Sequence, residues 1–490
     1  MFEAAEIGNA IDKPTYKAEA PKVREALLDV QARMRDRGLA VVVVLGGVEG
    51  AGKSETLNEL LEWMDARGIQ THALRDPTDE ERDRPYMWRF WRVLPPKGRM
   101  GIFLGSWYSE PMQDLFQGCP RADVDLTLDR IIDFERMIHA EHTLVIKVWL
   151  HLSKDAQKDR LKELEHDPDR RWRVTDADRL YRKHYDRIRE IAEHVLRRTE
   201  IPEAPWHIVE GADARYRQLT VAQLIVKRVN ERLAQLAEDD ARAPAEPDRP
   251  KPAPVNILNR LDLAAKLDRK DYEDKLEKLQ GKLFRLSRRL HRKGRSMVLA
   301  FEGPDAAGKG GAIRRLTGAM DARDYQVISI AAPTDEERAH PYLWRFWRHV
   351  PGHGRITVFD RSWYGRVLVE RIEGFCRPEE WRRAFAEINA FEQQLADHGV
   401  VLIKFYLEIS PDEQLRRFRA RAATPYKQYK ISAEDWRNRD KWDAYEAAAC
   451  EMIEKTSSEA APWVLVEAND KPSARIKVLK AVTDRLEEML

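Results

Sequence analysis

The sequence repeats itself at a separation of 256 to 257 residues, and this repeat constrains the fold more than any other feature. The segment Thr78-Asp-Glu-Glu-Arg82 recurs as Thr334-Asp-Glu-Glu-Arg338, and Ala204-Pro-Trp206 recurs as Ala461-Pro-Trp463. These matches follow the same order in both halves of the chain. With 490 residues in total, each copy is long enough to bury a hydrophobic core of its own. The chain is therefore predicted to be a tandem duplication of one domain.

A proline-rich segment separates the two copies. Its prolines are Pro244, Pro247, Pro250, Pro252 and Pro254. This composition favours extended polyproline II geometry and contains too few apolar residues to pack a core. We therefore predict an N-terminal domain at residues 1–240, a linker at 241–256 and a C-terminal domain at 257–490.

Charge and composition exclude several classes of protein. The 85 basic and 83 acidic residues nearly cancel, so overall charge gives no support for non-specific nucleic-acid binding. The N-terminus lacks the pattern of a signal peptide, and the apolar stretches are far shorter than the ~20 residues of a membrane-spanning helix. The cysteines Cys119, Cys376 and Cys450 lie far apart without a CxxC pair. These features predict a cytoplasmic protein with neither a membrane nor a nucleic acid as its partner.

Within each copy, the pattern alternates between helical and β-branched segments. In the C-terminal copy, leucines at spacings of three and four predict a helix over 272–292. Short apolar runs predict strands at 296–301, 356–359 and 400–407. Alternating strands and helices are typical of an α/β domain with a parallel sheet flanked by helices. In such sheets the chemistry gathers at the carboxyl ends of the strands.

A glycine-rich loop with the pattern of a phosphate-binding loop follows the first strand of the C-terminal copy. It runs from Gly303 to Gly310 and precedes a helical segment. Backbone N–H groups of such a loop curl around phosphate oxygens, and Lys309 can reach a terminal phosphoryl group. The backbone groups predicted to do so belong to Gly303, Ala306, Ala307, Gly308 and Gly310. The alternative is a tight strand-to-helix turn that needs glycines for its geometry alone.

The loop lacks the hydroxyl that ordinarily binds magnesium in this motif, because Gly310 stands where a Ser or Thr is usual. Asp305 in the loop and Asp360 at the end of the next strand but one are the carboxylates available to hold the metal. We predict Mg²⁺ as the ion, with Mn²⁺ as an alternative. A simpler interpretation of Asp305 is that it caps the helix that follows.

Several basic residues later in the C-terminal copy form a candidate polyanion-binding set. They are Arg371, Arg416, Arg417, Arg421 and Lys430. Arginines three to four residues apart can present several guanidinium groups on one helix face. The alternative is a solvated helix balanced by its own acidic residues. The position of the run after the strand 400–407 favours a mobile arginine lid over the phosphates.

Four motifs of the C-terminal copy together resemble the second family of polyphosphate kinases. They are Glu302-Gly-Pro-Asp-Ala-Ala-Gly-Lys-Gly-Gly311, Phe359-Asp-Arg-Ser-Trp-Tyr364, Val367-Leu-Val-Glu-Arg371 and Trp442-Asp443-x-Tyr445. The resemblance spans almost all of residues 260–490. One departure is Pro304, where many relatives carry a longer polar side chain; this puts any side-chain contact with phosphate there in doubt.

The resemblance implies a P-loop kinase fold with a helical lid in each of two tandem domains. It also implies magnesium at Asp305 and Asp360, and catalytic roles for Asp305, Lys309, Asp360 and Arg361. Two fused copies suggest the subclass that transfers the terminal phosphoryl group of inorganic polyphosphate to AMP, giving ADP.

The N-terminal copy departs from this pattern and is predicted to be degenerate. It keeps Lys53 and Ser54 in its phosphate loop, but Glu49 replaces the loop aspartate. Leu104 and Gly105 replace the Asp-Arg pair at the strand end, so a metal ligand and a cation are both lost. Stability, dimerisation or guidance of polyphosphate are the roles left to this copy. Its loop leaves nucleotide or phosphate binding open.

Three alternative functions remain at this point. An ATP-dependent nucleoside monophosphate kinase would use the same loop and lid, and a polyphosphate kinase could take ADP or GDP as its acceptor. The third alternative is a non-catalytic module that binds polyphosphate. A homo-oligomer is also left open.

Overall fold

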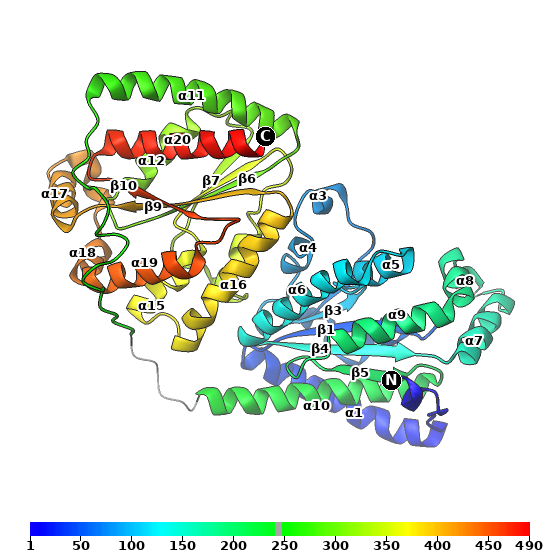
Figure 1. Ribbon diagram of the computed structural model, residues 1–490. Helices are drawn as coiled ribbons and strands as arrows, with labels where there is room; N and C mark the ends of the chain where they lie inside the picture. Colours follow the sequence, from blue (N-terminus) through cyan, green and yellow to red (C-terminus); the bar gives the residue numbers. More distant parts are fainter. Residues whose placement is uncertain (170, 241–246) are drawn as a thin grey trace. The chain divides into compact units, whose positions relative to one another are not determined.

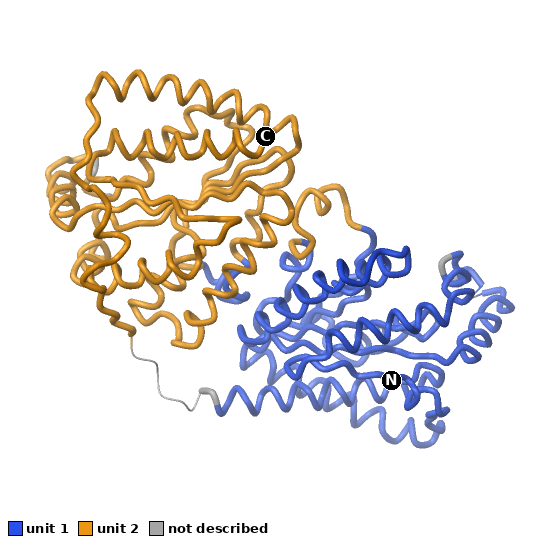
Figure 2. Tube along the Cα trace, viewed as in Figure 1, with its two compact units in different colours: residues 1–76, 89–242, 334–344 blue, residues 77–88, 243–333, 345–490 orange. Residues whose placement is uncertain are grey.

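The computed structural model describes residues 1–169, 171–240 and 247–490. Within these ranges the chain forms two compact units (Figure 2). Unit 1 comprises residues 1–76, 89–242 and 334–344, and unit 2 comprises residues 77–88, 243–333 and 345–490. Each unit thus consists mainly of one copy of the sequence repeat and also includes a short segment of the other copy.

Unit 1 is built on a sheet of parallel strands. The strands are β1 (Ala40–Gly47), β2 (Ile69–Ala73), β3 (Met100–Leu104), β4 (Thr143–His151) and β5 (Trp206–Glu210). Their order across the sheet is β2-β3-β1-β4-β5. The central strands β1 and β4 are hydrophobic along nearly their whole length because helices cover both faces of the sheet.

Helices cover the two faces of this sheet, with α1 and α10 together on one face and α6 and α9 on the other (Figure 1). The longer helices are α1 (Lys13–Asp36), α2 (Lys53–Trp63), α5 (Ser109–Gln117), α6 (Arg121–Ala140), α7 (Lys154–His166), α8 (Asp176–Lys183), α9 (Tyr185–Arg198) and α10 (Ala214–Asp240). The helices of four residues each are α3 (Asp79–Arg82), α4 (Trp88–Trp91), α13 (Asp335–Arg338) and α14 (Trp344–Trp347).

Unit 2 repeats this topology. Its strands are β6 (Met297–Glu302), β7 (Tyr325–Ser329), β8 (Ile356–Asp360), β9 (Val401–Glu408) and β10 (Trp463–Glu467). The order β10-β9-β6-β8-β7 is again fully parallel, and the register pairs Phe301 with both Asp360 and Phe405. The central strand β6 therefore has its carboxyl end between those of β8 and β9, and this is the switch point where α/β sheets bind ligands.

The helices of unit 2 are likewise divided between the two faces. They are α11 (Arg269–Arg292), α12 (Lys309–Thr317), α15 (Val369–Glu373), α16 (Pro378–Asp397), α17 (Pro411–Ala422), α18 (Ala433–Asp440), α19 (Trp442–Thr456) and α20 (Lys471–Met489). Figure 1 shows α11 and α20 together on one face and α16 and α19 on the other. Leu283 and Leu290 of α11 are fully buried in this core, which confirms the predicted helix at 272–292.

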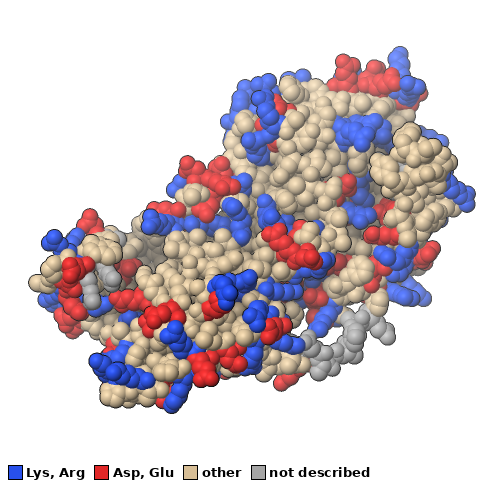
Figure 3. Space-filling model, turned by 180° about the vertical axis from the view of Figure 1, so that it is seen from behind, with Lys and Arg blue, Asp and Glu red and all other residues tan. Residues whose placement is uncertain are grey.

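The distribution of charge on the surface and the hydropathy of the helices match what the composition predicts. On the face drawn in Figure 3, basic and acidic side chains are interspersed in small groups. Among the residues that the structure describes, no helix is long and apolar enough to cross a membrane.

A buried ion pair with a complete set of hydrogen bonds lies in the core of unit 2. The Lys404 ammonium donates to Glu392 Oε2 at 2.7 Å, to Tyr364 Oη at 2.9 Å and to the Thr456 carbonyl at 2.5 Å. The other carboxylate oxygen of Glu392 accepts from Trp363 Nε1 at 2.9 Å and from the Tyr364 hydroxyl at 2.5 Å. The network joins β9, α16, α19 and the segment after β8.

Unit 1 contains the same network. Lys147 donates to Glu135, to the Tyr108 hydroxyl and to the Thr199 carbonyl at 2.8, 3.2 and 2.7 Å. Lys147 and Glu135 are both fully buried. Because the copy without the Asp-Arg pair keeps this network, we assign it to the fold rather than to the chemistry.

Another buried acid, Glu408, closes β9 and is 7% exposed. Burial, together with the neighbouring Glu446 carboxylate, raises the pKa of Glu408 from 4.5 to about 8. Tyr406 and Cys450 also face this acid. Burial is the main reason why the pKa values of both side chains are raised. The folded chain therefore holds a proton at Glu408 that an unfolded chain releases above pH 4.5.

This proton makes the stability of the protein depend on pH. Between about pH 5 and 8 the folded state binds one more proton than the unfolded state, so its stability falls as pH rises, by up to about 1.4 kcal/mol per pH unit. We expect the Glu408→Gln variant to lose this contribution. Urea unfolding at pH 5, 6.5 and 8 measures it for both proteins. A variant with the same pH slope as the wild type would contradict the assignment.

Candidate active site

The carboxyl ends of β6, β8 and β9 place the predicted loop and its partners at one edge of the unit 2 sheet. Gly303 leaves β6 with φ +132°, and a Cβ atom there would stand 2.3 Å from the Leu407 carbonyl oxygen. Glycine is therefore required where the loop passes β9. Helix α12 begins at Lys309, directly after the loop, as the sequence predicts.

The loop places its amides and one cation at the N-terminus of α12. Lys309 is buried, and its ammonium donates to the carbonyls of Gly303 at 2.5 Å and Pro304 at 3.3 Å. Burial and the nearby Arg361 charge lower the pKa of Lys309, while neighbouring carboxylates oppose this shift. The Ala307 N–H donates to the Pro304 carbonyl at 3.1 Å, within the loop itself.

The remaining predicted amides belong to Gly303, directly after β6, and to Ala306, Gly308 and Gly310, at the N-terminal end of α12. The helix dipole adds a partial positive charge at that end. Together with the Lys309 ammonium, this arrangement can bind the oxygens of a phosphate group.

Asp305 joins the loop to two other elements. Its Oδ1 accepts from Arg361 Nη2 at 2.6 Å, and its Oδ2 accepts from Asn438 Nδ2 at 2.9 Å. Burial alone would raise the pKa of Asp305, but the charges of Lys309 and Arg361 and these hydrogen bonds outweigh it and lower the pKa. Asp305 is therefore ionised at neutral pH. Asp305 does not cap the helix that follows, because Gly308 is the N-cap residue of α12.

Asp360 ends β8 beside the start of α12. A Cβ atom built on Gly310 would lie 3.9 Å from Asp360 Oδ2. The carboxylate of Asp360 therefore borders the position that the Ser or Thr of an ordinary phosphate loop occupies. Two carboxylates, with phosphate oxygens and water as further ligands, suit a hard divalent cation. Among the described residues, no group of three His, Cys, Asp or Glu side chains converges on a metal site, so further ligands would come from substrate or water.

Arg417 has a different role from the lid arginine that the sequence predicts. All five N–H groups of its guanidinium donate to the protein itself: Nε to Glu413, Nη1 to the carbonyls of Ala306 and Ala307, and Nη2 to the carbonyls of Ala468 and Asn469. The side chain is buried, at 4% exposure. Arg417 thus fixes the shape of the phosphate loop from behind rather than presenting charge to a ligand.

The other predicted basic residues differ in their placement. Arg371 is buried between Asp248 and Glu451, each at 2.7 Å, and packs over the Trp381 ring. Its charge is neutralised there, so the predicted contact with phosphate does not match its position. Arg416 is exposed and bonded to Glu413, and Arg421 is half-buried on α17. The side chain of Lys430 lies outside what the structure describes.

The sequence patterns predict no role for Glu302, although a motif includes it, and they do not reveal the lid residue Asn438. Glu302, at the end of β6, accepts from the Ser362 N–H at 2.7 Å and its hydroxyl at 2.8 Å, and thereby fixes the backbone after Asp360 and Arg361. Burial raises the pKa of Glu302. Asn438 comes from α18, and no motif marked it.

A second acid, Glu373, holds the same lid helix. Its side chain is 4% exposed; it forms an ion pair with Arg437 Nε at 3.0 Å and accepts a hydrogen bond from Lys441 Nζ at 2.8 Å. Tyr445 Oη lies 3.3 Å from Glu373 and 3.2 Å from Asn438 Oδ1. These contacts continue the chain of hydrogen bonds that begins at Asp305.

Two residues of this site have a backbone conformation that favours glycine. Ala306 and Arg361 have φ values of +65° and +63°. At the corresponding positions of unit 1, Gly50 and Gly105 have φ values of +85° and +74°. Holding a non-glycine residue in this region costs about 1 kcal/mol or more. Unit 2 therefore carries backbone strain at Arg361 that unit 1, with glycine at this position, does not.

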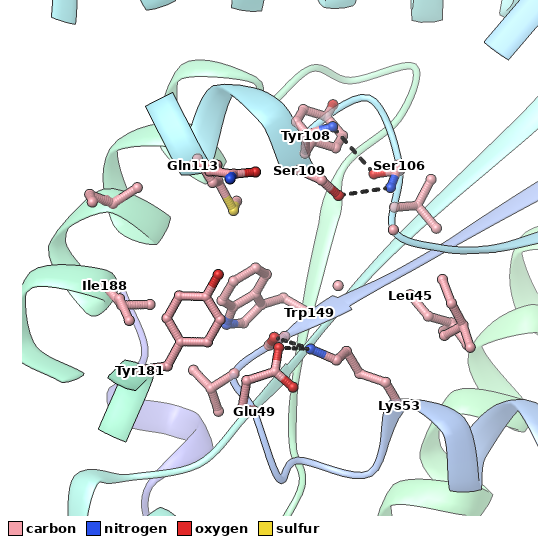
Figure 4. A pocket seen from close by; sticks show the side chains of 18 of the residues that line it. Leu45, Glu49, Lys53, Ser106, Tyr108, Ser109, Gln113, Trp149, Tyr181 and Ile188 are labelled. Atoms are coloured by element: carbon pink, nitrogen blue, oxygen red, sulfur yellow. Dashed lines mark hydrogen bonds and ion pairs between the residues drawn. The ribbon is translucent and has the colours of Figure 1, made fainter. Parts of the chain in front are cut away.

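The corresponding edge of unit 1 keeps the loop without its partners. Lys53 donates to the Gly47 carbonyl and to Glu49 Oε1, both at 2.9 Å. Gln157 donates to the Glu49 carbonyl at 3.0 Å, as Gln414 does to the Asp305 carbonyl. Leu104 and Gly105 border a cavity of about 310 Å³ that this loop lines (Figure 4).

Comparison with known proteins agrees with this geometry. The polyphosphate kinase 2 family model matches residues 10–237 and 266–490. The chain is 49% identical over 489 residues to the polyphosphate:AMP phosphotransferase of Pseudomonas aeruginosa PAO1, covering 99% of each chain. It is 47% identical over 493 residues to the protein of that name from Pseudomonas syringae pv. tomato, covering 100% of this chain and 98% of the relative.

A solved structure shares the whole fold. A Pseudomonas aeruginosa PA01 protein described as a polyphosphate kinase 2 superposes with a TM-score of 0.88 at 48% identity, covering 100% of this chain and 99% of that one. Both copies of the repeat are therefore accounted for by one family. The chain belongs to the polyphosphate kinase 2 family.

Proposed function

We propose that unit 2 transfers the terminal phosphoryl group of inorganic polyphosphate to AMP, giving ADP and a polyphosphate one unit shorter. The observation that carries the proposal is the gathering of Asp305, Lys309, Asp360 and Arg361 around one loop. The names of the full-length relatives support AMP as the acceptor.

The reaction needs little acid–base chemistry. A phosphate monoester has a second pKa of about 6, so the α-phosphate of AMP is mostly dianionic near neutral pH and can attack without a general base. The attacking oxygen forms a bond to the terminal phosphorus as the bridging P–O bond breaks, and the leaving charge stays on the shortened chain. The difficulty is the repulsion between two polyanions.

Positively charged groups of unit 2, held in fixed positions, offset this repulsion. Lys309 and the loop amides bind the terminal phosphate, and Arg361 stands where charge develops during transfer. The Asp305–Arg361 ion pair holds the guanidinium before substrate arrives. Asn438 and Arg437 come from α18, so closure of this helix would bring the lid to the same phosphates.

A divalent cation completes the charge balance. We infer that Asp305 and Asp360 would hold Mg²⁺, or Mn²⁺ in its place, and that this ion would supply positive charge for the phosphate oxygens of the donor. Ionised Asp305 and the space beside Gly310 fit this ion.

The assay that tests the function supplies one phosphoryl donor at a time. The purified chain is incubated with Mg²⁺ and AMP, GMP, ADP or GDP, with either long-chain polyphosphate or ATP, and products are separated by anion-exchange chromatography. We expect ADP to form from AMP with polyphosphate. Turnover with ATP alone would identify a nucleoside monophosphate kinase, preference for ADP or GDP would change the acceptor, and binding without conversion would contradict an enzyme.

We further infer the division of the chain into a degenerate domain at residues 1–240, a linker at 241–256 and a catalytic domain at 257–490. The two family matches at 10–237 and 266–490 support it. Residues 241–246 of the linker lie outside the described residues. Inorganic polyphosphate and AMP or ADP are the proposed partners, and the cytoplasm, where nucleotides are abundant, is the proposed compartment.

A substitution at Arg417 can test whether the shape of the phosphate loop matters while the side chain keeps its positive charge. In the Arg417→Lys variant one ammonium cannot donate to four carbonyls, so the loop amides shift. We expect kcat with polyphosphate and AMP to fall by about 100-fold. The matched control is Arg419→Lys, an exposed residue of the same helix. Steady-state kinetics of both variants measure the effect, and equal activity would contradict the role of Arg417.

A further inference from the structure

The cavity of unit 1 lies where unit 2 has its site, at the carboxyl ends of the central strands. Its volume of about 310 Å³ is in the range of small-molecule sites. Strands β1 and β3, helices α5, α8 and α9 and the phosphate loop supply its walls. Figure 4 shows side chains from these elements around one open space.

The duplication shows what has changed in this space. Leu104 and Gly105 stand at the positions of Asp360 and Arg361, and Gly46 stands at the position of Glu302. On the lid side, at an offset of 257, Tyr181 takes the place of Asn438 and Ile188 that of Tyr445. Charged and polar groups have been replaced by aromatic and aliphatic ones. The space has therefore changed from one that suits a polyanion to one that suits a flat, largely apolar molecule.

One end of the cavity still suits a phosphate group. The loop residues Gly47, Lys53 and Ser54 line it, and α2, which begins at Lys53, directs its N-terminus to the same place. Among the described residues that line the cavity, Lys53 is the one cation, and Glu49 is paired with it at 2.9 Å. Because Glu49 neutralises Lys53, the loop amides and the N-terminus of α2 supply the attraction, and this partial charge suits a single phosphate rather than a chain of phosphates.

Beside the loop, the cavity also has walls that suit a planar ring. Phe116, Tyr181 and Ile188 border it, and the Trp149 ring lies against Gly46, where a Cβ atom would be only 3.1 Å from the indole. Aromatic faces stack on nucleobases with little dependence on sequence. The Gln113 amide, which carries both a donor and an acceptor, lines the same cavity from α5 (Figure 4). A purine edge needs such a pair of groups.

We propose that the cavity of unit 1 binds a purine nucleoside monophosphate and does not transfer a phosphoryl group to it. The phosphate occupies the loop at Lys53 and Ser54, and the base lies among Phe116, Trp149 and Tyr181. With Leu104 and Gly105 in place of Asp360 and Arg361, the ligand remains unchanged when bound. This site is separate from the acceptor site of unit 2.

The test labels the full-length protein with 8-azido-AMP, without polyphosphate, and maps the labelled peptides. We expect labelled peptides from residues 176–191 of unit 1, with labelling suppressed by excess AMP but not by polyphosphate. The Ile188→Trp variant fills the cavity and abolishes this label, and Lys53→Gln weakens competition by AMP at least tenfold. Leu126→Trp, which adds the same bulk at an exposed position of α6, retains the label.

Several outcomes would overturn the proposal. Absence of label in unit 1 while unit 2 peptides are labelled would show that unit 1 has no such site. Competition by adenosine equal to that by AMP would show that the loop does not bind the phosphate, and competition by polyphosphate would show a polyanion site. Label on unit 2 peptides reports the acceptor site in the same sample, so failure of the proposed function is seen separately. A retained label there in Ile188→Trp also shows that the variant is folded.

Discussion

The Asp360→Asn variant is expected to phosphorylate AMP about 100- to 1,000-fold more slowly than the wild type. The substitution keeps the size of the side chain but removes the charge of the carboxylate that lies beside Gly310. Lys309→Ala is expected to lose at least as much, because it removes the buried ammonium at the terminal phosphate. Initial rates with polyphosphate, AMP and Mg²⁺ measure both effects.

The controls keep the comparison within one unit. Asp271→Asn and Lys278→Ala change exposed residues of α11 and are expected to retain full activity. Circular dichroism of all four variants checks the fold. A rate above a tenth of the wild type in Asp360→Asn would contradict the role of the Asp360 carboxylate in turnover.

A second large effect is expected from the buried network at Lys404. The Lys404→Met variant leaves Glu392 buried without its ion pair, although Trp363 and Tyr364 still donate to it. Removing one partner of a buried pair costs about 3–5 kcal/mol. We expect a loss of this size in the free energy of unfolding of unit 2, measured by urea titration followed by circular dichroism.

The double variant Lys404→Met with Glu392→Leu separates two effects. One is the loss of the Lys404–Glu392 interaction, and the other is the cost of burying the unpaired Glu392 carboxylate. The double variant replaces both charges with apolar groups and is expected to be more stable than Lys404→Met alone. Lys147→Met is the matched change in unit 1 and is expected to cost about as much there, since its contacts are the same. If Lys404→Met stayed within about 1 kcal/mol of the wild type, the network would not be the stabilising element described here.

The sequence predicts the sheet well because its central strands are continuous apolar runs. The expected strands at 296–301 and 400–407 are β6 (Met297–Glu302) and β9 (Val401–Glu408), displaced by a single residue. The phosphate loop is also a local pattern, because its glycines and Lys309 are adjacent in the chain. Features of this kind need no knowledge of the tertiary structure.

The basic residues show where such patterns fail. Spacing along α17 indicates which arginines share a helix face, but it does not indicate that the guanidinium of Arg417 reaches four backbone carbonyls. The neutralising partners of Arg371 are Asp248 and Glu451, which are remote in sequence. Contacts over such separations depend on tertiary packing and are not visible in local spacing.

Comparison of the two copies could have found some of the missed residues. Glu373, Asn438 and Lys441 surround the lid in unit 2. At the same offsets the N-terminal copy has Gln117, Tyr181 and His184. Polar residues that change together with Asp360 and Arg361 are candidates for the chemistry, whereas the Lys404 network, which does not change, belongs to the fold.

The residue after β8, Arg361, has a left-handed backbone conformation, and the corresponding residue of unit 1 is Gly105. Once glycine occupies position 105, the backbone there relaxes, and an arginine could return only against a free-energy cost of about 1 kcal/mol. Its return alone would restore no metal ligand, because Leu104 would remain. Glycine at position 105 therefore avoids the backbone strain that unit 2 carries at Arg361, and an arginine there would bring that strain back. An engineer who wished to build the Asp-Arg pair of unit 2 into unit 1 would therefore have to change both positions and accept the backbone strain at position 105.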